Sequence, residues 1–172
     1  MKAVSGHKLK YYLVISVFIL SFSTDGLCQT KYPATYTLKK NSFYLTAGAY
    51  PEGLYGNITG NFERIIAEFP KSFFQAFQVR IGGGPWVAWL AEGINFFSVA
   101  SLLMGRSGSH LETGMGVLFT YRTDRKQWDP IVNGKHIAGN IGYRFQRPGG
   151  EFVLRGALGW PEGFYLSLGL CF

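Results

Sequence analysis

Large apolar residues recur at every second position over much of this chain. The clearest case is residues 164–172, where one face is bulky and apolar and the other carries Tyr, Ser, Gly and Cys. A period of two is typical of a β-strand with two unlike faces. The apolar positions of this stretch are Phe164, Leu166, Leu168, Leu170 and Phe172.

Eight segments in all show strand character, most of them 9–14 residues long. A tilted strand needs about 9–11 residues to cross a bilayer. A possible turn of helix at Trp86–Glu92 is the one exception to the all-β pattern. The predicted strands are Ser42–Tyr50, Leu54–Ala67, Phe73–Gly83, Gly93–Leu103, His110–Arg122, His136–Gln146, Glu151–Trp160 and Phe164–Phe172.

The two faces of these strands differ in residue type. In segment 110–122, for example, Met115 and Val117 alternate with Gly114 and Gly116. Segments 73–83, 136–146 and 151–160 behave in the same way, whereas segment 93–103 has bulky residues at adjacent positions, and its faces stay unassigned. The direction of the apolar face separates a soluble barrel from a membrane barrel.

The composition of the faces favours the membrane barrel. The non-apolar face consists mostly of Gly, Ser, Ala and Asn, with few charges, and would make a poor solvent-exposed surface for a soluble barrel. The bulky residues are too many for the inside of an eight-stranded barrel, which only just accommodates side chains. We therefore predict an all-β, eight-stranded antiparallel transmembrane up-and-down barrel with a filled polar lumen.

Connection lengths predict the topology. If the N-terminus and Phe172 both lie in the periplasm, the short periplasmic turns are Glu68–Ser72, Met104–Ser109 and Arg147–Gly150. The outward loops are then Pro51–Gly53, Gly84–Glu92, Thr123–Lys135 and Pro161–Gly163. Aromatic residues near strand ends fit the interfacial girdles of such barrels. They include Tyr50, Tyr55, Tyr121, Trp128 and Trp160.

The first 28 residues have the features of a secretory signal peptide. Basic residues precede an apolar run of 12 residues, Tyr11–Phe22, which is too short to span a membrane as a helix. Small residues at Gly26 and Cys28 suit cleavage after Cys28; acylation of Cys28 as a lipoprotein is the alternative. The predicted organisation is a removed signal peptide (1–28), a periplasmic N-terminal segment (29–41) and an outer-membrane barrel (42–172).

The charged, cysteine and histidine residues predict no nucleic-acid site, no internal disulfide and no metal site. Of the 17 Lys and Arg and 10 Asp and Glu, 3 and 1 lie in residues 1–28, which leaves 14 against 9 and a net charge of +5. These charges are scattered, so no nucleic-acid site is predicted. Cys171 alone remains after cleavage, so it forms no internal disulfide and is expected to face the lumen. His110 and His136 lack further ligands at useful spacing, so no metal and no cofactor is expected.

Three phrases carry a family resemblance: Asn61–Arg64, Leu111–Gly116 and Ile141–Phe145. With the signal peptide and the alternating strands, they resemble small eight-stranded outer-membrane β-barrels, such as OmpX-like proteins, the OmpA transmembrane domain and uncharacterised barrels of Bacteroidetes-type bacteria. The resemblance implies outer-membrane lipid and the barrel-assembly machinery as partners. It implies that the terminal strand, ending on Phe172, is the assembly signal. It leaves the oligomeric state open.

Placing the apolar residues outward sends five charged residues into the lumen. A buried charge is costly unless it is paired, so we expect a structural ion-pair network. A polar relay or a small-anion site is the alternative, favoured by three Arg against two Glu. The residues are Glu63, Arg80, Glu112, Arg144 and Arg155.

The expected function is non-enzymatic, either envelope-structural or an interaction through the outward loops. The first alternative is a lipid-A-modifying enzyme, built on Ser109, His110 and Glu112 or on His136 with Asp129 and Ser98. No motif supports it, and Ser109 and His110 fall at the predicted periplasmic rim. The second alternative is a narrow channel or small-ligand transporter.

Overall fold

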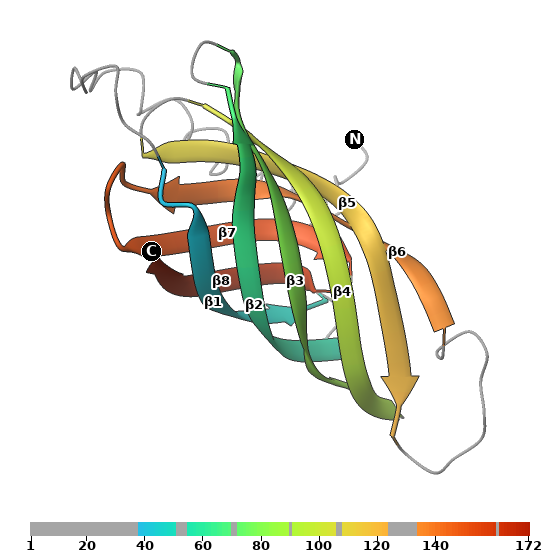
Figure 1. Cartoon of the computed structure of the whole chain (residues 1–172). Coiled ribbons are helices and arrows are strands. Elements are labelled where there is room, and N and C mark those ends of the chain that lie inside the picture. Colours follow the sequence, from blue (N-terminus) through green and yellow to red (C-terminus); the bar gives the residue numbers. More distant parts are fainter. Residues whose placement is uncertain are drawn as a thin grey trace, which may run out of the picture. The chain divides into compact units, whose positions relative to one another are not determined.

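The computed structural model describes residues 38–50, 55–69, 72–89, 91–105, 108–123, 134–160 and 162–172. These residues form one closed antiparallel barrel of eight strands (Figure 1). The predicted signal peptide and most of the predicted segment 29–41 lie outside the described residues. The strands are β1 (Asn41–Ala49), β2 (Tyr55–Glu68), β3 (Phe74–Ala88), β4 (Ala91–Met104), β5 (Ser109–Arg122), β6 (Gly134–Gln146), β7 (Phe152–Trp160) and β8 (Gly163–Cys171).

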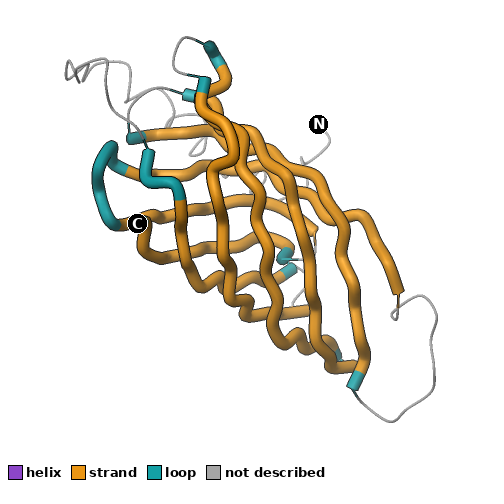
Figure 2. The backbone as a smooth tube through the Cα atoms, viewed as in Figure 1, coloured by secondary structure: helices purple, strands orange, loops and turns teal. Residues whose placement is uncertain are grey.

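Each strand pairs with the next, and β8 pairs with β1 over Ser42–Ala49 and Phe164–Cys171. This closure leaves no unpaired sheet edge. Strands make up most of the described chain, and the loops and turns described between them are short (Figure 2). Among the described residues, no helix has the length and apolar composition needed to cross a membrane. The prediction of an all-β barrel with eight antiparallel strands is confirmed.

The strands are tilted because their register is staggered. Register partners followed once around the barrel from Gln146 lead through all eight strands and return to β6 at His136, ten residues away. With ordinary strand spacing, this stagger corresponds to a tilt of about 40°. A barrel of this size has an interior just wide enough for its own side chains.

Exposure confirms the direction of the two faces. The five apolar residues predicted on one face of 164–172 are 52–64 % exposed, whereas Tyr165, Ser167 and Cys171 between them are buried. Exposed large apolar side chains come from every strand. The apolar face therefore points out of the barrel, and Cys171 points in.

Strand β4 alternates like the others, although its sequence conceals this. Phe97, Val99 and Leu103 are buried, while Ile94 and Phe96 are exposed. Both faces of β4 carry bulky apolar residues. Residue type alone therefore could not distinguish them.

The predicted outward loop at Gly84–Glu92 is wrong, as is the possible turn of helix within it. Strand β3 continues to Ala88, and β4 begins at Ala91. Gly84-Pro85 has the composition of a turn, but Pro85 pairs with Ile94 of β4. Between β2 and β3, the ladder pairs residue 57 with 86 and residue 60 with 83, and it skips the two residues between on each strand. Proline, which has no N–H to donate, is tolerated at such a break.

One end of the barrel carries residues 38–40 and the β2–β3, β4–β5 and β6–β7 turns; we call it the terminus end. The opposite end, the loop end, carries the other four connections. Near the terminus end, Leu38 packs in a buried apolar cluster with Ile65, Ala76 and Leu103. The backbone N–H of Ile65 donates to the carbonyl of Lys40 at 2.8 Å. Part of the predicted periplasmic segment 29–41 thus packs on the barrel.

Candidate functional site

The five charged residues predicted to face the lumen all lie in the interior, each at most 2 % exposed. They come from five strands, because each occupies an inward position in the alternation of its own strand. The structure brings four of them together as two ion pairs, and the fifth finds a partner that the sequence analysis missed. The residues are Glu63 on β2, Arg80 on β3, Glu112 on β5, Arg144 on β6 and Arg155 on β7.

The first ion pair joins Arg144 to Glu63, with Nη1 donating to Oε1. The guanidinium also donates to Gln146 Oε1 at 2.8 Å from Nη2, to Gln78 Oε1 at 3.2 Å from Nη1 and to Ser42 Oγ at 3.2 Å from Nη2. Its acceptors stand on four strands. This satisfies a buried cation that would otherwise be costly.

The second ion pair joins Arg155 to Glu112 in bidentate geometry. Arg155 Nη2 donates to Oε1, and Nε donates to Oε2 at 3.0 Å. Asn140 Nδ2 adds a third donor to Oε1 at 2.9 Å. Two parallel N–H···O bonds to one carboxylate fix orientation as well as charge.

Tyr44 connects the two pairs into one network. Its hydroxyl donates to Glu63 Oε2 at 3.1 Å and accepts from Arg155 Nη1. The Arg155 guanidinium also lies 4.7 Å from the centre of the Tyr44 ring. The phenol therefore bridges the carboxylate of one pair and the cation of the other.

Arg80 pairs instead with Glu162, whose Oε1 accepts from Arg80 Nη1 at 3.0 Å. The sequence analysis placed Glu162 in the outward loop 161–163, but it is fully buried. Gly163 has a φ of +72°, which favours glycine, and a Cβ at Gly48 would stand 2.1 Å from the carbonyl oxygen of Glu162. These two glycines let the β7–β8 turn fold inward.

A signal for Glu162 was present in the sequence as an imbalance of three inward Arg against two inward Glu. The structure removes that imbalance. Among the described residues, the buried Arg and Glu side chains number three of each, and every Arg is paired with a carboxylate. The argument for an anion site, which rested on the excess of Arg, is thereby lost.

The residues considered for catalysis are not assembled. Ser109 and His110 are successive residues of β5, so they face opposite sides of the sheet; Ser109 Oγ accepts from Tyr143 Oη at 2.6 Å. Glu112 is engaged by Arg155. His136 is on an inward position and Ser98 on an outward one, while Asp129 lies outside the described residues.

Aromatic residues gather at the loop end. Tyr50 lies 5.4 Å from Tyr55 and 5.7 Å from Trp160, ring centre to ring centre, and Tyr55 stacks on Trp86 at 5.9 Å. Burial raises the pKa of the Tyr50 phenol from its ordinary value to about 12. Trp86, predicted in a loop, is 4 % exposed and points into the barrel. Of the other predicted girdle residues, Tyr121 is exposed and Trp128 lies outside the described residues.

Neither family comparison nor metal geometry adds a function. No protein-family model matches the chain, and no curated protein matches it significantly. Within the described ranges, no three His, Cys, Asp or Glu side chains cluster in a way that could hold a metal ion.

Proposed function

We propose that this chain is an integral outer-membrane β-barrel protein. Its role is non-enzymatic, either structural in the envelope or an interaction through its outward loops. The observation that carries this proposal is the exposed belt of large apolar side chains contributed by all eight strands. Soluble monomers rarely expose contiguous apolar patches above a few hundred Å². A belt around a whole barrel suits hydrocarbon, where it needs no other partner.

The backbone and the interior support the same environment. A closed barrel pairs its backbone groups strand to strand, which is what a spanning structure needs in lipid. The interior holds polar side chains and paired charges, including three Arg–Glu pairs. Apolar outside and polar inside is the pattern of outer-membrane barrels.

The interior favours a structural role over transport. Arg80, Arg144 and Arg155 are at most 1 % exposed and are committed to carboxylates of the same chain. Their side chains fill a lumen that is already narrow at eight strands. We therefore propose a lumen filled by polar side chains and closed to general solute passage.

Location and partners follow from the proposal. Export would use the predicted signal peptide, residues 1–28. The barrel-assembly machinery would then insert the chain, and β8 together with Phe172, which follows it, offers five exposed apolar residues on one face. Outer-membrane lipid would cover the belt, and the loop end would face the cell exterior.

Membrane fractionation with gel electrophoresis of unheated and heated samples tests the proposal. We expect the protein in the outer-membrane fraction, with a mobility that changes on heating, because a folded barrel resists mild detergent. A protein that folds in water, stays in the soluble fraction and shows no heat-dependent shift would refute it.

Two further measurements test the non-enzymatic and closed character. Lipid A analysed by mass spectrometry should be the same in cells carrying wild type, His110→Ala or His136→Ala. A lipid A modification that is present in cells carrying wild type and absent in cells carrying either variant would support an enzyme instead. The purified protein in planar bilayers should give no discrete conductance steps, and reproducible steps would indicate a channel.

A further inference from the structure

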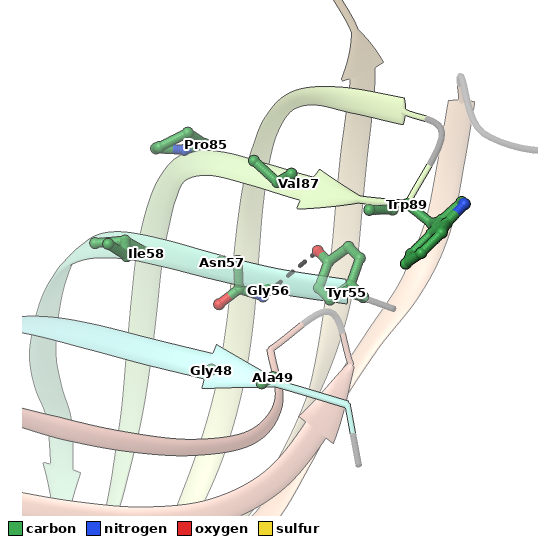
Figure 3. A pocket seen from close by; sticks show the side chains of 10 residues that line it. Gly48, Ala49, Tyr55, Gly56, Asn57, Ile58, Pro85, Val87 and Trp89 are labelled. Atoms are coloured by element: carbon green, nitrogen blue, oxygen red, sulfur yellow. Dashed lines mark hydrogen bonds between the residues drawn. The ribbon is translucent and has the colours of Figure 1, made fainter. Parts of the chain in front are cut away.

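A groove of about 660 Å³ crosses β1, β2 and β3 near the loop end (Figure 3). That volume lies within the range of about 300–1,000 Å³ typical of small-molecule sites. It is lined by Gly48, Ala49, Tyr55, Gly56, Asn57, Ile58, Pro85, Val87, Ala88 and Trp89.

The groove opens on the outer face of the barrel. Ile58 and Val87 are 60 % and 58 % exposed, and with Pro85 they project from the same side of the sheet in Figure 3. Ala49 and Gly56, paired across β1 and β2, hold small positions between longer neighbours. The groove is therefore a depression in the apolar belt, formed where side chains are missing.

Two of the residues that line the groove, Ile58 and Pro85, lie at the break in the β2–β3 ladder. Ile58 and Thr59 on β2 and Gly84 and Pro85 on β3 are skipped by that ladder. The strands still lie close together, since a Cβ on Gly84 would stand 2.0 Å from the carbonyl oxygen of Ile58. Alternation continues through the break, since Ile58 and Val87 point outward and Asn57 and Trp86 inward, so the hollow comes from the small residues that line it.

We propose that the groove binds one acyl chain of a membrane lipid from the leaflet around the loop end. This inference rests on the proposed function, because it takes the apolar belt to be in a bilayer. A hollow in hydrocarbon leaves its lining atoms without contacts unless a neighbour fills it. In a bilayer, lipid tails are the neighbours of this face, and an acyl chain lying in the groove restores those contacts.

The position of Trp89 orients the chain. Trp89 follows the last residue of β3 and is 79 % exposed. Tryptophan favours the headgroup level of a bilayer, whereas Ile58, three positions into β2, lies nearer its middle. The acyl chain then runs from Trp89 toward Ile58, as a lipid of that leaflet requires.

The chain itself offers a matched pair of variants. Gly56 and Gly60 both face outward on β2, but only Gly56 lines the groove. A Cβ at Gly56 would meet only the carbonyl oxygen of Gly48, at 3.8 Å, and one at Gly60 would meet nothing within 4 Å. Gly56→Leu should fill the groove, while Gly60→Leu adds the same side chain outside it.

Photo-crosslinking measures whether an acyl chain occupies the groove. The protein is reconstituted in vesicles of phosphatidylethanolamine and phosphatidylglycerol that contain a phosphatidylethanolamine with a diazirine on its palmitoyl chain. We expect wild-type crosslinks to concentrate at Ile58 and Val87 relative to Leu158, which is equally apolar, 56 % exposed on β7 and outside the groove. Gly56→Leu should lower the Ile58 and Val87 crosslinks several-fold, and Gly60→Leu should leave them unchanged.

Crosslinks spread evenly over Ile58, Val87 and Leu158 in the wild type would overturn the groove proposal without any variant. So would equal crosslinking in Gly56→Leu and wild type. If Gly56→Leu fails to fold, Ala49→Leu fills the groove from β1 and carries the same expectation. Heat-dependent mobility of each reconstituted sample separates the two proposals. A wild type that never inserts refutes the membrane barrel, whereas one that inserts without preferential crosslinking refutes only the groove.

Discussion

The outer and inner faces of the same eight strands are specified in different ways. The outer face repeats one class of residue, and Leu166, Leu168 and Leu170 of β8 illustrate how interchangeable its members are. The inner face depends on particular partners, such as Arg155 with Glu112 and Tyr44. The outer face needs only apolar side chains of any kind, whereas the inner face needs particular side chains that contact one another. Substitutions should therefore act by different rules on the two faces.

The largest effect is expected where one partner of the inner network is removed. Arg155→Met leaves the Glu112 carboxylate buried without its bidentate partner and should lower the free energy of unfolding by about 3–5 kcal/mol. Urea unfolding in lipid vesicles measures it. The double variant Arg155→Met/Glu112→Met should recover most of the loss, because it removes both charges. A single-variant loss below about 1 kcal/mol would contradict the importance of the pair.

On the outer face, a charge should be nearly as damaging, but only in lipid. Leu168→Arg places a cation on the belt in the middle part of β8 and should cost about 2–4 kcal/mol, as for a cation near the bilayer midplane. The same vesicle unfolding assay measures it, with Leu168→Ile as the control that keeps the residue class. A neutral Leu168→Arg would mean that this face does not meet hydrocarbon.

An intermediate effect is expected at Glu162. Glu162→Gln keeps the shape of the side chain but leaves Arg80 without its counter-charge, at a cost of about 1–3 kcal/mol. Glu151, whose side chain is 73 % exposed and 3.7 Å from Lys39, provides the control. Glu151→Gln should change the unfolding free energy by less than about 1 kcal/mol. Equal effects of the two variants would argue that Glu162 does not act as a buried partner.

The smallest effect tests the tolerance of the outer face. Met115 is 71 % exposed on β5, so Met115→Leu exchanges one apolar side chain for another in the belt. The unfolding free energy should stay within about 0.5 kcal/mol of wild type. A loss above about 2 kcal/mol would mean that the outer face also depends on specific packing.

Sequence periodicity predicted the strands because an alternating chain has only one way to separate its two faces. The eight strands follow from a period of two. The outward direction of their apolar faces, and with it the burial of Cys171, follows from the composition of the two faces. Periodicity could not assign β4, where Phe96 and Phe97 are equally apolar. Composition wrongly placed Gly84-Pro85 in a loop, because the residue types of a segment do not show which neighbouring strand it pairs with.

Five of the six buried charges of the candidate site were predictable, but the sixth, Glu162, and the pairing of all six were not. The alternation of side chains along each strand placed five charged residues inward. Alternation does not say which Arg contacts which Glu across the barrel. That depends on the stagger, which emerges only when all eight strands are paired. Glu162 was missed because it lies in a turn, where alternation ends and the φ of Gly163 sets the direction.

Pairing of β1 with β8 has a consequence for how the barrel forms. It brings together residues far apart along the chain, such as Ser42 and Cys171, which are 129 positions apart. The entropy lost in joining such distant segments grows with the length of chain between them, and topologies rich in distant pairings fold slowly. Until β1 meets β8, two strand edges stay open to other chains. The interval between synthesis and closure is thus when this protein is most prone to aggregate.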